Sequence, residues 1–421
     1  MLRVFSQVSL RMQRVGYLKR LIKRVNNTPT SNLENVGKDL IDTALRKFQY
    51  QLDENVAEYI KSRLTGNSYT SIKKQTNEWL AKKVNDKILL LELQDLYLAD
   101  IKLPSRVGRL VKEDWRKYPQ FGISLGFIRS GTYSSTTRGL LFLHLTSENE
   151  LQAFAEYLPN FNPFLISLKQ NLLLLYSFLD NDGEIIVPLW LKLRNNMTSN
   201  FSERNAGDLL PQIIKNITAR YKNKMLQVDL RKRLESLDKT ADTISRQVNI
   251  QDYSSVSARE ETIRIRLEPI VDMGLLGKLN PFRFEYSFTE SGKVWVEALE
   301  GYEESIALSE FLDRSFFVTA AKANKISTTN ISKEEILQFL YSAWKILSSS
   351  NGYAPIEDLS LLACMNSLVD NGKILEIGTA RETIIAYQKD NPYKVRFTVD
   401  RMGNLAHAKF IEDFSSRLPQ R

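Results

Sequence analysis

The sequence contains very few of the residues that most often carry chemistry in proteins. Cys364 is its only cysteine, and His144 and His407 are its only histidines. A single thiol excludes an intrachain disulfide and a zinc site made of several thiolates, and two imidazoles exclude a multi-histidine metal centre. The residue counts leave only metal sites made of carboxylates possible. We predict no metal and no cofactor.

Familiar catalytic and nucleotide-binding motifs are missing as well. No glycine-rich run ends in Gly-Lys-Ser/Thr, which excludes the usual phosphate-binding loop. No Glu is followed two residues later by Lys, which removes the common form of a metal-dependent nuclease signature. His144 lies in the apolar run GLLFLHLT and is expected on a strand, whereas His407 follows a hairpin turn and is expected to be exposed. We therefore predict no catalytic residue, with an unrecognised nuclease or hydrolase as a less favoured alternative.

Hydropathy and charge restrict the partners. No apolar run is long enough to cross a membrane, so we expect a soluble cytoplasmic protein without a membrane partner. The 421 residues carry a formal net charge of +9, which favours an anionic partner. Residues 1–33 contain basic residues but no Asp or Glu. This start fits an ordinary basic helix or arm, our preferred interpretation, and also a targeting segment.

The hydrophobic pattern divides the chain into five parts. Apolar positions at helical spacing predict a helical N-terminal region over residues 1–117, and turns between β-rich runs predict a small β-hairpin and helix over residues 118–164. Residues 165–305 form a composite domain with a long helical insertion. Residues 306–331 are expected to be a linker, and residues 332–421 a second domain.

The clearest motif lies in residues 257–299. Ser257 and Glu260 have the spacing of a capping box, so a helix should begin there, and Gly274 should end it. Apolar and aromatic residues then occupy every second position of residues 282–288, which predicts a strand. Helix, glycine stop and aromatic strand follow one another within about forty residues of chain.

The preceding residues predict helices separated by a tight turn. We expect a helix over residues 168–179, a turn at Asp180–Gly183 within the DNDGE sequence of residues 180–184, and a short helix through Leu193. The DNDGE sequence only faintly suggests a calcium loop, because the distal Glu that such a loop needs is missing. A further helix should begin near Asp208 and continue towards Leu237, protruding from the domain.

The final region repeats part of this pattern. Another capping box begins at Ser332, residues 373–377 are expected to be a strand, and a hairpin follows with its turn at residues 402–404. The residues expected to face inward from this hairpin are Val395, Phe397 and Val399.

A helix with basic flanks, a glycine stop and an aromatic β-wing resembles the second half of a winged-helix domain. The C-terminal region has a similar pattern. The resemblance implies a mainly α fold with small β-wings (α+β), in which a helical N-terminal region is followed by two winged-helix-like domains. It also implies a double-stranded DNA partner, although winged helices serve as protein-docking modules too.

Under this resemblance the helix that begins at Ser257 would make base or groove contacts, and the wings and the helical insertion would contact phosphates. The candidate DNA-binding residues are Arg259, Thr262, Arg266, Lys278, Arg283, Lys293, Lys222, Lys224, Arg231, Lys394, Arg396 and Arg401. The alternative is that the arginines of the helix form surface ion pairs with Glu260, Glu261 and Asp272.

We therefore expect a non-catalytic double-stranded-DNA-binding protein that is a subunit of a larger DNA-acting assembly. The alternative is a structural or adaptor subunit of a chromosome-maintenance, segregation or anti-phage defence complex. In that case the winged helices and the long helical segments would bind protein partners or a second copy of the chain.

Overall fold

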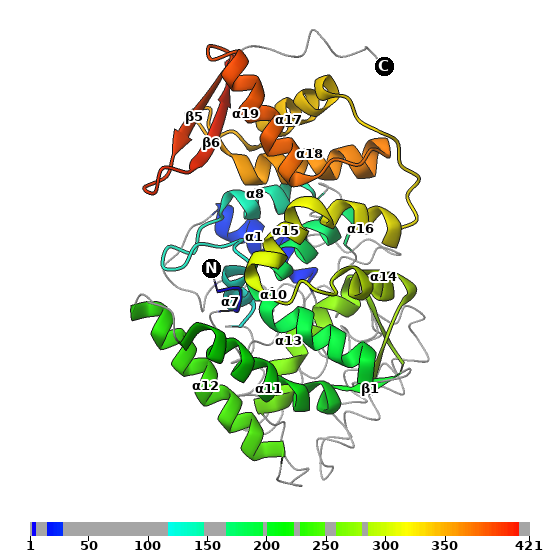
Figure 1. Cartoon of the computed structure of the whole chain (residues 1–421). Coiled ribbons are helices and arrows are strands. Elements are labelled where there is room, and N and C mark those ends of the chain that lie inside the picture. The colour runs from blue at the N-terminus through cyan, green and yellow to red at the C-terminus, as the bar shows by residue number, and fades with distance from the viewer. Residues whose placement is uncertain are drawn as a thin grey trace, which may run out of the picture.

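The computed structural model describes residues 2–5, 15–27, 117–146, 166–196, 200–222, 228–248, 258–279 and 285–411. This part of the chain is mainly helical and contains two small antiparallel sheets of three strands each (Figure 1). The expected mainly α fold with small β elements is confirmed at this level. The helices expected between residues 33 and 116 lie outside the described residues. None of the described helices has the length and apolar character that a membrane crossing needs.

The first module comprises a helical layer and one of the sheets. Its elements are α10 (Leu168–Asn196), β1 (Phe201–Ser202), α11 (Glu203–Lys222), α12 (Val228–Val248), α13 (Ala258–Asp272), β2 (Leu276–Lys278) and β3 (Glu285–Phe288). Strand β3 pairs with both β1 and β2, so it is the central strand, and the first, third and second strands in chain order lie side by side across the sheet. Gly274, with a φ of 74°, follows the end of α13 as expected.

The single long helix expected in this module is instead an antiparallel pair, α11 and α12. The Thr218 hydroxyl of α11 donates to Asp238 of α12 at 2.8 Å, and Lys215 pairs with Asp242 at 3.2 Å. Leu237 of α12 is buried. The second helix therefore folds back and buries its apolar side against the first.

The second module has the same order of elements without the extra helix. It consists of α17 (Lys333–Leu347), β4 (Ala354–Pro355), α18 (Ile356–Asn371), α19 (Ile377–Asp390), β5 (Val395–Val399) and β6 (Leu405–Phe410). Strand β6 pairs with both β4 and β5, so the order is again first, third, second. The expected capping box at Ser332 and Glu335 is present. The strand expected at residues 373–377 is wrong, because Lys373 forms only an isolated bridge and Ile377 begins α19.

The linker expected over residues 306–331 contains packed helices. The helices between the two modules are α14 (Glu290–Ala298), α15 (Ser305–Arg314) and α16 (Phe316–Ala323). Phe311 and Phe316 are fully buried and lie 6.3 and 5.0 Å, ring centre to ring centre, from Trp295 of α14. A segment with that much buried aromatic surface is part of the core, and the linker expectation is corrected accordingly.

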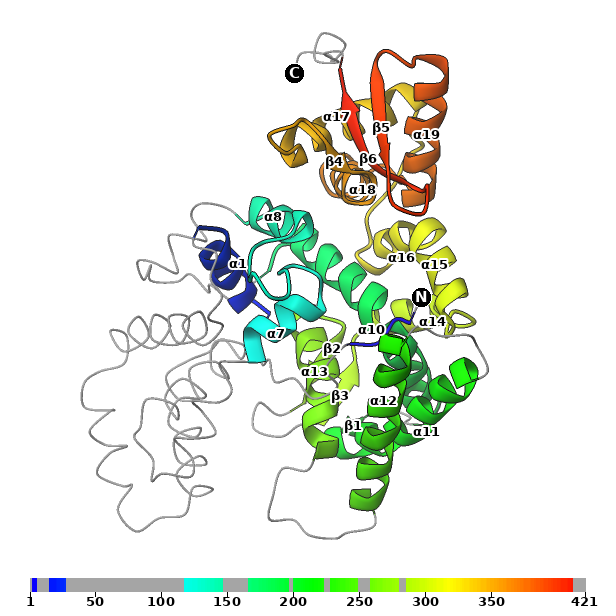
Figure 2. The ribbon, with the colours of Figure 1, turned by 90° about the vertical axis from the view of Figure 1, so that its left-hand side faces the viewer.

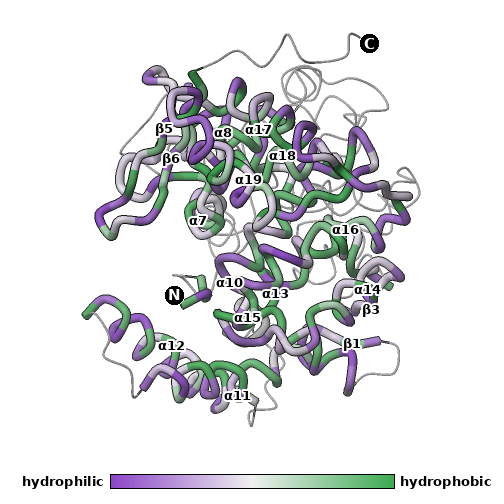
Figure 3. Tube along the Cα trace, turned by 45° about the horizontal axis from the view of Figure 1, so that its top comes forward, coloured by the Kyte–Doolittle hydropathy of each residue, from purple (hydrophilic) through white to green (hydrophobic). Residues whose placement is uncertain are grey.

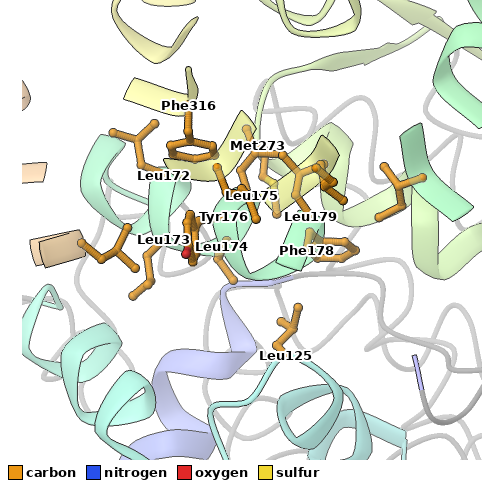
Figure 4. Close-up of a cluster of buried hydrophobic side chains, with 14 of the residues drawn as sticks. Leu125, Leu172, Leu173, Leu174, Leu175, Tyr176, Phe178, Leu179, Met273 and Phe316 are labelled. Carbon is orange, nitrogen blue, oxygen red and sulfur yellow. The ribbon is translucent and has the colours of Figure 1, made fainter. Parts of the chain in front are cut away.

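Helix α10 runs through the centre of the molecule as one uninterrupted helix (Figures 1 and 2). The turn expected at Asp180–Gly183 is therefore wrong. Figure 4 shows α10 side chains between Leu172 and Leu179 packed among Phe316, Met273 and Leu125, which come from other parts of the chain. At Gly183 an added Cβ would lie 2.1 Å from Leu308 of α15, so glycine permits the close approach of these two helices.

The hairpin expected within residues 118–164 is mostly helix in its described part. Helices α7 (Lys117–Ser124) and α8 (Thr137–His144) are joined by a turn in which Ile128 and Ser135 form a single bridge. The Thr136 hydroxyl caps α8 by accepting from the amide of Gly139, which places His144 at a helix end and not on a strand. Helix α1 (Tyr17–Asn27) packs against both α7 and α8.

An ion pair between α10 and α13 lies in the interior of the first module. Arg266 and Asp182 are both fully buried, and their side chains meet at 2.7 and 3.0 Å. The backbone amide of Phe5 donates to Asp182 at 2.9 Å, and that of Arg3 donates to Glu184 at 2.8 Å. Residues 2–5 are thus held against α10 by two carboxylates of the DNDGE sequence.

The third carboxylate of that sequence connects the two modules. Arg138 of α8 pairs with Asp180 of α10 at 3.1 Å and with Asp358 of α18 at 3.3 Å, while Arg3 pairs with Asp180 at 2.9 Å. Tyr176 of α10 donates directly to Glu357 of α18 at 2.9 Å. These contacts connect the second module to α10.

Replacing Arg266 with methionine should lower the free energy of unfolding by about 3–5 kcal/mol, because Asp182 would stay buried without a countercharge. Urea unfolding of the full chain measures this difference. Arg231→Met, at an exposed position of α12, is the matched control and should change stability by about 0.5 kcal/mol or less.

The double variant Arg266→Met/Asp182→Leu should recover much of the loss, since it removes both buried charges together. A loss below about 1 kcal/mol for Arg266→Met alone would mean that the pair behaves like a solvated surface pair.

Candidate nucleic-acid interface

The helix expected to enter a DNA groove is enclosed by the rest of the first module. No residue of α13 between Thr262 and Asp272 is exposed. Thr262 is 1% exposed, and the Arg266 guanidinium binds Asp182, which lies 84 residues earlier in the chain. Thr262 and Arg266 are therefore removed from the set of DNA contacts. Arg259 lies in the first turn of α13, and its side chain is outside the described residues.

The basic residues of the first sheet bind groups of the protein itself. Lys278 of β2 pairs with Glu268 at 2.9 Å and its side chain is 8% exposed. Tyr286 donates to the same carboxylate at 2.5 Å. Burial is the main cause, and the charge of Glu268 the second, that raises the pKa of the Tyr286 phenol well above its ordinary value. Lys278 is thus a structural residue. Arg283 and Lys224 lie outside the described residues.

The remaining candidates of the first module are exposed but balanced by acidic neighbours. Lys293 of α14 pairs with Glu290 at 2.7 Å on the surface. Lys222 ends α11 and Arg231 lies on α12, where exposed acidic residues are interspersed with the basic ones. The exposed acidic residues of α12 are Asp229, Glu235, Asp238 and Asp242. This surface has both signs of charge, which weakens its attraction for a polyanion.

The third helix of the second module, α19, is covered at its start by α15. Ion pairs join Arg314 to Glu382 and Asp313 to Arg381. At Gly378 an added Cβ would lie 3.2 Å from the Arg314 guanidinium, which shows how closely the two helices approach. The first turns of α19 are therefore not free to enter a groove in this arrangement.

Basic residues also gather on the C-terminal hairpin, defined here as residues 394–410, which has four of them and one acidic residue. Its strands bring Arg396 opposite Lys409 and Thr398 opposite His407, while Val395 is fully buried on the other side. The solvent-facing side consequently carries basic and hydrogen-bonding groups together. Hydrophilic stretches alternate with apolar ones along this hairpin in Figure 3.

The basic groups of the hairpin differ in how firmly they are held. Arg396 and Arg401 are exposed, and neither has an acidic partner in the described part of the chain. Lys409 donates to the carbonyl of Asn351 at 3.0 Å and lies over the ring of Tyr353, and Lys394 is half-buried. Arg396 and Arg401 are thus the two cations best placed to reach an external anion.

The single acidic residue of the hairpin, Asp400, accepts hydrogen bonds from the turn that follows it. The Asp400 carboxylate accepts from the backbone amides of Asn404 at 2.9 Å and Met402 at 2.8 Å, and from the Asn404 side chain at 3.1 Å. These bonds, chiefly that from the Asn404 amide, lower the pKa of Asp400. Gly403 supplies the positive φ, 82°, that the turn requires. The basic charge of the hairpin is therefore only partly offset, by a carboxylate bonded to its own backbone.

Two features of this surface were not anticipated from the sequence. Val399, expected to face inward, is 61% exposed, because the register shifts between Thr398 and Val399 and rotates the end of β5 outward. The covering of α19 by α15 also had no local signal, since its ion pairs join residues 68 positions apart. His407 is exposed as expected, and its ring lies 3.1 Å from the Thr398 hydroxyl.

The two sheets do not form one continuous face. The hairpin lies at one end of the molecule, whereas α11, α12 and β1 lie at the other in both views (Figures 1 and 2). A single short duplex segment therefore cannot bind both surfaces at once.

Among the described residues, no group of three or more His, Cys, Asp or Glu side chains is arranged to hold a metal ion.

Comparison with protein-family models, with curated proteins and with solved structures finds no match in any of the three.

Replacing Asp400 with alanine should loosen the hairpin turn, because three hydrogen bonds to its carboxylate would be lost. We expect faster amide hydrogen exchange at Met402 and Asn404, and unchanged exchange at Ala408 in β6. Asp390→Ala, which removes an exposed carboxylate at the end of α19, is the control. Equal protection at Asn404 in wild type and Asp400→Ala would contradict the assigned role.

The same turn should respond to pH. Since the folded-state pKa of Asp400 lies below its ordinary value of 3.8, its stabilisation is complete above that value and is lost as the pH falls through the lowered pKa. The amide chemical shift of Asn404, followed by NMR during acid titration, should report a midpoint below 3.8. A midpoint at or above the ordinary value would contradict this.

Proposed function

We propose that this chain is a non-catalytic, double-stranded-DNA-binding protein with two winged helices, and that the C-terminal hairpin is the wing that contacts DNA. The observation that carries the proposal is the exposed pair of arginines, Arg396 and Arg401, on a hairpin whose single acidic residue is bonded to its own turn. A location in the cytoplasm, as a subunit of a larger DNA-acting assembly, completes the proposal.

The order of elements supports two winged helices. Each module runs helix, strand, helix, helix, strand, strand, and each sheet has the order first, third, second. In the first module α12 is an addition between the second and third of these helices. A helical core followed by a hairpin that extends from a small sheet is the arrangement to which the name winged helix refers.

The two modules would have different tasks. The third helix of the first module, α13, is enclosed and serves the core, so that module acts as a scaffold. In the second module α19 is partly covered, which leaves the hairpin as the contact surface. Basic side chains without an exposed reading helix favour phosphate contacts over base-edge contacts. We therefore expect binding that depends strongly on salt and weakly on sequence.

The covered helices also favour a second candidate function, a structural or adaptor subunit that binds protein partners or a second copy of the chain. In that case α15 and α19 would form a fixed platform and the hairpin would contact an acidic protein surface. Absence of duplex binding at low salt, with a folded hairpin, would select this alternative.

Duplex affinity should decrease linearly with the logarithm of the salt concentration, with a slope of about −0.9 for each phosphate neutralised. Arg396→Ala and Arg401→Ala should each weaken binding at low salt and make the slope shallower by about 0.9, because each removes one phosphate contact. Fluorescence anisotropy of a labelled duplex, titrated at several salt concentrations, measures both quantities.

The control is Arg246→Ala, which removes one positive charge from an exposed position of α12. It should leave the affinity and the slope nearly unchanged. An equal effect of all three substitutions would mean that overall charge, and not the hairpin, governs binding. Unchanged binding in the double variant Arg396→Ala/Arg401→Ala would remove the hairpin from the interface.

A further inference from the structure

The tip of the C-terminal hairpin carries exposed apolar side chains beside its arginines. Met402 is 85% exposed, Val399 61% and Leu405 40%. The apolar residues of a sheet normally face its packed side, as Val395 does in this hairpin. At the tip three of them project into solvent within seven residues of chain, and Arg401 lies among them.

The tip is held in one conformation. The Asp400 carboxylate binds the backbone amide of Met402 at 2.8 Å, and the Asp400 amide donates to the carbonyl of Asn404 at 2.8 Å. Gly403 adds its hydrogen bond to the carbonyl of Asp400 at 3.1 Å. An exposed apolar side chain on an ordered turn loses little conformational entropy in the backbone when it is buried by a partner.

The charge on the hairpin favours a polyanion as the partner. Arg396, Arg401 and Lys409 lie on the hairpin, and the one carboxylate among them is bonded to the turn. A partner that offers both dense negative charge and apolar surface is duplex DNA, since its phosphates flank stacked bases. A protein surface that matches this pattern would have to combine an apolar pocket with a ring of carboxylates.

We propose that the hairpin tip enters the minor groove of duplex DNA and that Met402 inserts between two stacked base pairs. This inference rests on the function proposed above and assigns the mode of binding. The minor groove is about 6 Å wide, too narrow for a whole two-stranded ribbon, so only the turn and its side chains enter it. Arg401 then contacts a phosphate at the edge of the groove beside the wedge, and Arg396 contacts a phosphate farther along the backbone.

Insertion of an apolar side chain separates neighbouring bases and bends the duplex away from the minor groove. Met402 is suited to this task because its unbranched, flexible side chain adapts to an irregular gap. Val399 and Leu405 lie on either side of the turn and would cover the sugar edges of the groove. Flexible base-pair steps would be preferred, since they unstack at lower cost.

The test uses the full chain and duplexes of one sequence in which 2-aminopurine, a base that fluoresces more when unstacked, occupies successive positions. Wild type should increase the fluorescence at one or a few central positions. Met402→Ala should lose most of this increase while its affinity falls by about tenfold or less, because the arginines still bind phosphates. Met402→Leu should restore the increase.

The matched control is Ile306→Ala, which removes an apolar side chain that is 84% exposed on α15, a helix outside the hairpin. It should leave the fluorescence increase unchanged. Binding without any fluorescence increase, or an equal increase with Met402→Ala, would overturn the wedge and leave DNA binding through the hairpin intact. Absence of duplex binding by wild type at low salt would overturn both proposals.

Discussion

The buried ion pair between Asp182 and Arg266 is the constraint on which the rest of the structure depends. Both side chains are fully buried, and neither charge is tolerable in the interior without the other. Pairing the two charges requires α10, α13 and residues 2–5 to pack together around Asp182, since the amide of Phe5 supplies a further donor to its carboxylate. The same closure that stabilises the core removes α13 from the surface, and with it the helix that the sequence pattern offers as a DNA reader.

The neighbouring carboxylates of α10 extend this arrangement to the second module. Asp180 and Glu184 are one helical turn apart and share a side of the helix, and Asp180 binds Arg138, which in turn binds Asp358 of α18. One helix therefore positions both modules. It leaves the C-terminal hairpin at the end of the molecule remote from α11 and α12 (Figure 1). The proposed DNA contact follows from this placement, because it is the module farther from the buried pair that has an exposed hairpin.

Two modules with one order of elements thus differ in what they expose. In the first module, the extra helix α12 and residues 2–5 cover the other helices, and Lys278 forms an ion pair with Glu268. In the second, α15 covers only the start of α19, and the hairpin keeps Arg396, Arg401 and Met402 in solvent. A repeated fold therefore gives one scaffold and one candidate contact surface, which is why fold alone does not assign function.

What the sequence could predict is the structure that depends on near neighbours. The capping box at Ser332, the helix stop at Gly274 and the turn at residues 402–404 each involve residues within a few positions, so their hydrogen bonds follow from local spacing. The burial of Arg266 and of the DNDGE carboxylates could not be predicted in this way, because a charged residue is expected at the surface unless its distant partner is known. Asp182 and Arg266 are 84 residues apart, and only the packing of α10 on α13 brings them together and makes their burial favourable.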